Sequence, residues 1–368
     1  KCDLRHTQFL KLRQSYQMVL CVGSSTKDRP KDFGLRLFSF DKETGQLTLL
    51  ANGAQGRSPT FAVFGNGFIY AVDEQDEGGG LDAYTWNGGE KLEHAGGCDL
   101  PGNGMCHVAL WPDGRHLSAA NYNTGSLVVC KLDNNGIPES LAAFEQHKGV
   151  GYDSAGRQEG PHTHFSAVAP GNDRLFVTDL GLDWVSVYRI DNHAGTLVQD
   201  VDENQVYTPL GAGPRHLAFS ADGQFWYLVT ELDNRVFVYS YDKATGRSRP
   251  IGNQPMLPQG FDGFNIASDI QLSPDGRFLY AANRGRNEVV CFSVDADTGN
   301  IAFCERYDAH CDMPRTFVMN DAHLVVAGQG NGKVVVLRRD AATGALGDVI
   351  CEVDVPGAAF VGFLPSSY

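Results

Sequence analysis

The chain has 368 residues, of which 42% are hydrophobic and 20% charged, and its formal net charge is -14 at pH 7. This length is sufficient for a large core, and the negative charge argues against nucleic acid and anionic membranes as partners. No apolar stretch reaches the roughly 20 residues of a membrane helix. Glycine and aromatic residues are abundant and helical periodicity is absent, so we expect an all-β protein of short strands and tight turns.

The nine cysteines are odd in number and form no C-x-x-C motif. Several lie in apolar, strand-like runs, so we expect free buried thiols in a reducing, cytoplasmic environment. Cys304, His310 and Cys311 do not have the spacing of a zinc site, and neither a metal nor an organic cofactor is expected. Residues 1–15 are polar and basic without the apolar core of a secretory signal, and we expect them to be a loose N-terminal arm.

The first predicted strands cover residues 16–25 and 35–47, and a D-x-x-T-G turn follows them. The same turn recurs at residues 242–246, 295–299 and 340–344. Its Asp can accept backbone N–H bonds and its Gly can adopt positive φ, as tight β-turns require. We interpret these turns as structural elements without a role in a site.

A unit of three strand-like runs separated by turns repeats along the chain and is clearest in residues 211–242. Further copies occupy residues 58–92, 105–133, 161–191, 268–295 and 314–340. The spacing of about 45 to 55 residues is typical of four-stranded antiparallel propeller blades. The less regular residues 134–160 are expected to form a long loop over one face.

The two ends of the chain complete the predicted ring. The first copy lacks an inner strand, and residues 358–364 resemble an inner strand with nothing after it. Pairing of the two terminal strands would close the ring and leave no open edge. We therefore predict a single seven-bladed β-propeller domain over residues 16–368.

The hairpin that turns near Gly223 predicts a functional rim. Residues equidistant from a hairpin turn face one another, which places Arg215 beside Glu231, with His216 adjacent. In the other copies, the position of Glu231 holds Ser24 or Ser25, Glu74, Tyr122, Asp179, Arg284 and Gln329. The start of the inner strand holds Cys106, His107, His164, Ser268, Asp269 and Arg315. Such a ring of basic and acidic groups favours an anionic substrate.

The sevenfold pattern, G-P-R-H at residues 213–216, T-E-L-D-N at 230–234 and H-T-H at 162–164 resemble the seven-bladed propeller lactonase family. This family includes bacterial 6-phosphogluconolactonases and fungal carboxymuconate-lactonising enzymes, and the resemblance extends over nearly all of the chain after Tyr16. It implies hydrolysis of a sugar-acid lactone, in the first place 6-phosphogluconolactone of the pentose phosphate pathway. The catalytic residues that it implies are His164, Arg215, Glu231 and Arg284. The expected substrate-binding residues are His162, His216, Arg315, Asp179, Glu74, Tyr122 and Gln329.

The chemistry of lactone hydrolysis suits these side chains. A water must lose a proton to a base, and positive charge must stabilise the carbonyl oxygen as it becomes an oxyanion. Either His164 or Glu231 is expected to handle the proton. Arg215, Arg284 and Arg315 are expected to hold the substrate anion.

Two alternatives accompany this interpretation. Reversible lactonisation of a carboxylated muconate would use the same arginines to bind carboxylates. A non-catalytic propeller that binds other proteins is a third hypothesis, although the W-D signature of the commonest such repeats is absent. The expected partner is a small anionic lactone, and the expected assembly is a monomer or a weak homo-oligomer.

Overall fold

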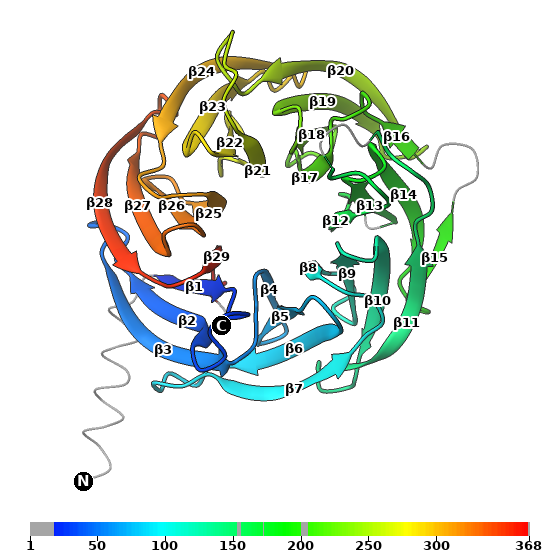
Figure 1. Ribbon diagram of the computed structural model, residues 1–368, viewed down its shortest axis with the longest axis vertical. Helices are drawn as coiled ribbons and strands as arrows, with labels where there is room; N and C mark the ends of the chain where they lie inside the picture. The colour runs from blue at the N-terminus through cyan, green and yellow to red at the C-terminus, as the bar shows by residue number, and fades with distance from the viewer. Residues whose placement is uncertain (1–17, 153–155, 172, 200–204, 367–368) are drawn as a thin grey trace.

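The computed structural model describes residues 18–152, 156–171, 173–199 and 205–366, which form seven antiparallel sheets arranged in a ring (Figure 1). We number the sheets as blades 1 to 7 in chain order. Six blades have four strands, and blade 4 has a fifth because β16 pairs with β14 alongside β15. The predicted all-β, seven-bladed fold is confirmed. The arm predicted for residues 1–15 lies outside the described residues.

The strands of each blade run in order from the central channel to the outer edge (Figure 1). Blade 1 consists of β29 (Ala358–Phe363), β1 (Met18–Ser24), β2 (Phe33–Phe40) and β3 (Leu47–Gln55). Blade 2 consists of β4 (Ala62–Gly65), β5 (Phe68–Glu74), β6 (Gly79–Thr85) and β7 (Glu93–Asp99). Blade 3 consists of β8 (Met105–Leu110), β9 (His116–Asn121), β10 (Ser126–Leu132) and β11 (Pro138–Gln146). Blade 4 consists of β12 (Thr163–Val168), β13 (Arg174–Asp179), β14 (Trp184–Asp191), β15 (Thr196–Gln199) and β16 (Gln205–Tyr207).

The remaining three blades repeat the four-stranded arrangement. Blade 5 consists of β17 (Pro214–Phe219), β18 (Phe225–Thr230), β19 (Arg235–Asp242) and β20 (Arg247–Pro255). Blade 6 consists of β21 (Ile266–Leu272), β22 (Phe278–Arg284), β23 (Glu288–Val294) and β24 (Ile301–Asp308). Blade 7 consists of β25 (Pro314–Met319), β26 (His323–Gly328), β27 (Lys333–Arg339) and β28 (Leu346–Asp354).

The C-terminal strand closes the ring. Strand β29 pairs antiparallel with β1, with Val361 opposite Val22. The last strand of the chain is thus the innermost strand of blade 1, as the two incomplete terminal copies predicted. Closure protects the inner edge of blade 1, whose backbone groups would otherwise be open to another chain.

The connection expected over residues 134–160 is shorter than predicted. Residues Pro138–Gln146 form β11, the outermost strand of blade 3, which pairs along β10 with two register shifts. Its apolar residues are limited to Leu141–Phe144 between polar residues, so the sequence pattern did not reveal the strand. Only residues 147–162 cross from blade 3 to blade 4.

The core consists of apolar clusters between neighbouring blades, one for each pair. Strand β18 illustrates the reason for its continuous apolar sequence. Trp226 and Leu228 pack toward blade 4, whereas Tyr227 and Val229 pack toward blade 6. Because alternate side chains of a strand point to opposite faces, a strand buried on both faces needs apolar residues at every position.

The D-x-x-T-G turns also join the blades. Gly344 has φ of +74°, and a Cβ atom there would lie 2.4 Å from Cδ1 of Phe278, the first residue of β22 in the preceding blade. Gly299 meets Phe225, the first residue of β18, in the same way at 2.3 Å. The glycine therefore serves the turn and the contact between blades.

Candidate active site

A β-bulge sets the direction of one side chain in the inner strand of several blades. In blade 5, Pro214 lies opposite Thr230 and His216 opposite Val229, so Arg215 has no partner in the ladder. Equivalent bulges leave Cys106 in β8, His164 in β12 and Arg315 in β25 unpaired. Bulges re-aim side chains. They lie at the end of the channel where the second strands terminate, and we call this end the mouth.

The bulge changes the predicted register but preserves the predicted contact. Counting from Gly223 placed Arg215 directly opposite Glu231, whereas Arg215 is the extra residue of the bulge and Glu231 follows the last residue of β18. The two side chains nevertheless meet, because Arg215 Nε donates to Glu231 Oε2 at 2.9 Å. The expected pairing of the guanidinium and the carboxylate is confirmed.

Three arginines converge on Glu231. Besides Arg215, Arg284 Nη2 lies 2.7 Å from Glu231 Oε2, and Arg157 Nη2 donates to Glu231 Oε1 at 2.8 Å. The side chains of Arg215 and Glu231 are 1% and 2% exposed. Arg215 also donates to the backbone carbonyl of Ser268 in blade 6. One carboxylate thus holds guanidinium groups from three segments far apart in the sequence, and positive charge remains in excess.

Glu231 and Arg215 both keep their charges near neutral pH. Burial alone would raise the pKa of Glu231, but the charges of Arg284, Arg215 and Arg157 outweigh burial and lower it to about 2. Burial, together with repulsion from Arg284, lowers the pKa of Arg215 to about 9 despite the attraction of Glu231. Glu231 is therefore ionised and a weak base, and Arg215 remains cationic at pH 7.

His164 lies beside this cluster as a neutral imidazole. Burial, followed by the charge of Arg215, lowers its pKa well below the usual value. Its ring contacts Tyr122 edge-on at 5.7 Å and His216 at 5.2 Å between centroids. Among the described residues, its Nδ1 atom has no hydrogen-bond partner. A neutral imidazole has one ring nitrogen without a hydrogen, and this nitrogen can accept a proton.

Below the mouth, aromatic rings fill the channel. His216 lies in contact with Phe61, His107 and Phe165, with centroid separations of 6.1, 5.8 and 4.9 Å. His216 Nδ1 donates to Asp269 Oδ1 at 2.9 Å, which fixes the orientation of the imidazole. Because Phe61 belongs to blade 2 and His216 to blade 5, these rings meet across the channel. They form an aromatic layer across the channel below the mouth.

The opposite side of the mouth carries a second carboxylate. Glu74, at the end of β5, accepts a hydrogen bond from the Thr60 hydroxyl. Arg315 Nη2 lies 3.7 Å from Glu74 Oε2, and Lys27 Nζ lies 3.8 Å from Oε1. Arg315 Nη1 donates to Gln329 Oε1 at 3.2 Å. Glu74, Arg315 and Gln329 were expected at the rim, whereas Lys27 was not recognised.

Tyr122 and His162 support the arginine cluster from blades 3 and 4. Their rings stack at 4.5 Å between centroids, and His162 Nδ1 donates to the carbonyl of Tyr122 at 2.8 Å. The Tyr122 hydroxyl accepts from Arg157 Nη2 at 2.9 Å. Both residues were expected to bind the substrate, and the structure brings them next to the charged groups of the mouth.

Asp179 has a different environment from the one expected. Its side chain is fully buried, and Oδ1 accepts backbone N–H bonds from His162, Gly181 and Leu182 at 2.8, 3.0 and 3.1 Å. Oδ2 is 2.6 Å from His147 Nδ1. The structure therefore does not make this carboxylate available to a substrate. It holds the connection between blades 3 and 4 in place.

Arg157 was missed by sequence reasoning. It lies in the connection between β11 and β12, and the sequence around it contains no motif. The irregular composition of this segment was the one available signal, because long loops often carry functional residues. Its contact with Glu231 spans 74 residues and depends on the path of the connection over the mouth.

Comparison with known proteins identifies the family of the chain. A family model described as "Lactonase, 7-bladed beta-propeller" matches residues 19–363. The chain belongs to the seven-bladed β-propeller lactonase family. It is therefore a lactone hydrolase, and the interpretation as a non-catalytic scaffold is not supported.

Relatives of this lactonase cover almost the whole chain. The 6-phosphogluconolactonase of Bacillus subtilis (strain 168) is 32% identical over 351 residues, which cover 93% of this chain and 97% of that protein. The 6-phosphogluconolactonase of Formosa agariphila is 29% identical and covers 92% of this chain and 97% of its own length. A solved structure of the periplasmic gluconolactonase of Pseudomonas aeruginosa is 30% identical with a TM-score of 0.89, covering 95% of this chain and 99% of that chain.

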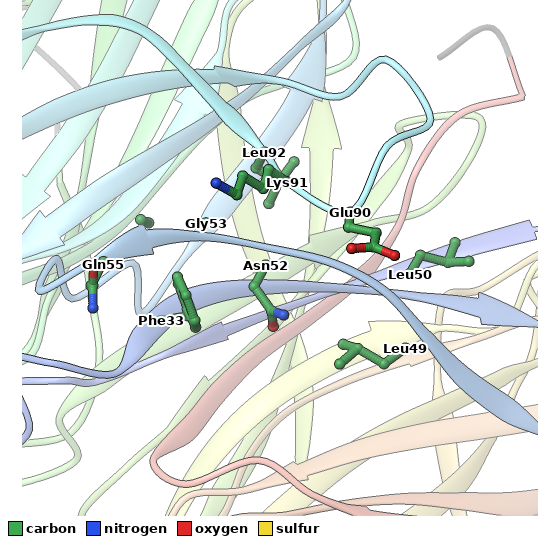
Figure 2. Close-up of a pocket in the computed structure, with 10 residues that line it drawn as sticks. Phe33, Leu49, Leu50, Asn52, Gly53, Gln55, Glu90, Lys91 and Leu92 are labelled. Atoms are coloured by element: carbon green, nitrogen blue, oxygen red, sulfur yellow. The ribbon is translucent and has the colours of Figure 1, made fainter.

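A groove of the lactonase lies outside the mouth. A groove of about 670 Å³ lies at the outer edge between β3 and the segment before β7, lined by residues that include Phe33, Leu49, Asn52 and Lys91 (Figure 2). It shares no residue with the mouth. Within the described ranges, no helix is long and apolar enough to cross a membrane.

Proposed function

We propose that this lactonase hydrolyses 6-phosphogluconolactone to 6-phosphogluconate, the reaction of the pentose phosphate pathway. The observation that carries the proposal is the convergence of Arg157, Arg215 and Arg284 on Glu231 beside the neutral His164. This excess of positive charge in a strongly acidic protein favours an anionic substrate. The names of two relatives support the phosphorylated sugar lactone.

His164 is the proposed base. It takes a proton from a water molecule as the water oxygen attacks the lactone carbonyl carbon. Arg215 and Arg284 stabilise the negative charge that develops on the carbonyl oxygen. The bond between the carbonyl carbon and the ring oxygen then breaks, and the leaving hydroxyl takes the proton from the imidazolium. The product is a ring-opened carboxylic acid, which ionises.

Glu231 has a positioning role in this scheme. Its pKa of about 2 makes it a poor proton acceptor near neutral pH. Its two oxygens instead hold three guanidinium groups at fixed positions, so that little reorganisation is needed when the oxyanion forms. We therefore propose His164 rather than Glu231 as the base.

The proposal is tested by following acid release from freshly prepared 6-phosphogluconolactone at constant pH. The purified protein should hydrolyse the lactone well above the spontaneous rate, and His164→Asn should lower kcat by about 100-fold or more, within the range for a lost general base. Full activity of His164→Asn would refute the assignment of the base. Glucono-δ-lactone and a carboxymuconate should be offered in parallel. Turnover of the carboxymuconate alone would support the alternative lactonising reaction.

We also propose that the protein acts in the cytoplasm. The eight cysteines in the described part of the chain are free thiols. Four of them are buried within strands, as the sequence suggested: Cys21, Cys106, Cys130 and Cys291. Lactonase activity in the cytoplasmic fraction of the source cells would support this location, and activity confined to an extracytoplasmic fraction would contradict it.

A further inference from the structure

Arg315 engages few of its donors compared with the other arginines of the mouth. Arg215 and Arg284 both donate to a carboxylate and to a backbone carbonyl. A guanidinium has five N–H donors, yet among the described residues Arg315 makes one hydrogen bond, to Gln329. Its contact with Glu74, at 3.7 Å, is longer than a hydrogen bond. Since its side chain is 16% exposed, Arg315 can bind a second anion without breaking a strong existing contact.

Lys27 is a second cation on the same side of the mouth. It lies on the connection between β1 and β2, and its side chain is 26% exposed. Its ammonium group is 3.8 Å from Glu74 Oε1, whereas Arg315 approaches Oε2 of the same carboxylate. Asp76 also holds Lys27 at 2.7 Å, but Asp76 is 79% exposed and this contact is weakened by water. Two cations therefore share one carboxylate, and neither cation contacts it at hydrogen-bond distance.

These two cations and His164 face the same mouth. Arg315 occupies the bulge of β25, the position that His164 occupies in β12 and Arg215 in β17, so the three lie at one level of the channel. After burial and the charges of Arg215 and His216, the charge of Arg315 is a further cause of the lowered pKa of His164. A molecule bound at His164 therefore experiences the charge of Arg315 from the other side of the mouth.

We propose that Arg315 and Lys27 form a phosphate subsite that selects lactones carrying a phosphate at the end remote from the carbonyl. This inference rests on the proposed lactonase reaction at His164 and extends it to substrate choice. Glu74 occupies the two cations in the free enzyme and competes with the incoming phosphate. Arg215 and Arg284 act on the carbonyl end, because Glu231 holds both of them on the His164 side of the mouth.

The subsite is tested by the ratio of kcat/KM for 6-phosphogluconolactone to kcat/KM for glucono-δ-lactone. Arg315→Ala should lower this ratio by about 10- to 100-fold, the range for a lost charge-assisted hydrogen bond, and Lys27→Ala should lower it in the same direction. Arg315→Lys keeps the charge but loses the planar fork, so it should restore part of the ratio. Lys42→Ala, which removes an exposed cation in a turn of blade 1, is the matched control and should leave the ratio unchanged.

Glu74→Gln should act in the opposite direction. The amide still accepts the hydrogen bond from Thr60 but no longer competes for the two cations. The KM for the phosphorylated lactone should fall, and inorganic phosphate should become a stronger competitive inhibitor. If Glu74 and Arg315 only maintain the local structure, substitution of either residue should instead weaken binding of the phosphorylated lactone.

The possible failures are distinct. If the unmodified protein hydrolyses neither lactone, the proposed function is wrong. If it hydrolyses both and the ratio stays within about twofold in Arg315→Ala and Lys27→Ala, the subsite is wrong and the lactonase reaction stands. Weaker inhibition by phosphate in Glu74→Gln would also overturn the inference.

Discussion

Replacing Glu231 by glutamine should reveal how much the arginine cluster depends on its carboxylate. The folded protein lowers the pKa of Glu231 from 4.5 to about 2 at a fully buried site. A shift of this size corresponds to about 3 kcal/mol of stability at pH 7, since one pKa unit is about 1.4 kcal/mol. This agrees with the roughly 3 to 5 kcal/mol lost when one member of a buried ion pair is removed. Glu231→Gln should therefore be less stable by about 3 kcal/mol at pH 7.

The same argument fixes the pH dependence. Because the folded pKa is below the unfolded one, the contribution of Glu231 is complete above about pH 5 and is lost as the pH falls toward 2. The difference in unfolding free energy between the unmodified protein and Glu231→Gln should thus shrink by about 1 kcal/mol between pH 5.5 and 3.5.

The assay is equilibrium unfolding in denaturant at several pH values. Glu352→Gln provides a control, since Glu352 forms an ion pair with Lys333 but its side chain is 52% exposed. This control should change stability by less than about 1 kcal/mol. A difference for Glu231→Gln that stays constant from pH 7 to 3.5, or a variant as stable as the unmodified protein, would refute the argument.

Three further predictions concern separate parts of the molecule. In denaturant unfolding, Gly344→Ala should destabilise the protein by about 1 to 3 kcal/mol more than Gly276→Ala. Both glycines have positive φ, but only Gly344 contacts Phe278. Equal effects would show that the contact between blades does not contribute. Arg157→Ala should lower kcat/KM at least about tenfold, and it should lower Tm less than Glu231→Gln does, since the Arg157 side chain is 37% exposed and two arginines remain on Glu231. Unchanged kinetics would exclude Arg157 from the site. Because the pKa of His164 lies well below 6.5, kcat/KM should remain level as the pH falls from 8 to 6, and a decline centred near pH 6.5 would contradict a neutral, buried base.

The mouth has an unequal arrangement of two carboxylates. Glu231 and Glu74 stand at corresponding positions in blades 5 and 2, at or just after the end of the second strand. Glu231 is bound tightly by three arginines, whereas Glu74 has two cations beyond hydrogen-bond distance. This difference separates a rigid side, suited to stabilise an oxyanion, from a side that can exchange one anion for another.

The local sequence determined the blades because turn chemistry and apolar runs act over short distances. The turn at Gly223 and the flanking runs were sufficient to predict β17 and β18, and the two incomplete terminal copies were sufficient to predict closure by β29. Repetition then placed the second-strand ends, such as Glu74 and Arg284, at one rim. Strand β11 was not predicted because its apolar run, Leu141–Phe144, is short and lies between polar residues.

Only the tertiary structure decided which rim residues act together. The bulge at Arg215 has no recognisable signal in the sequence, and the contact of Arg157 with Glu231 joins segments 74 residues apart. Asp179 matched the rim pattern, yet its carboxylate is taken up by His147 and by the backbone N–H groups of His162, Gly181 and Leu182. The repeat in the sequence determines where a side chain lies along the channel axis. Its direction and its charge depend on neighbours that come close only when the chain folds.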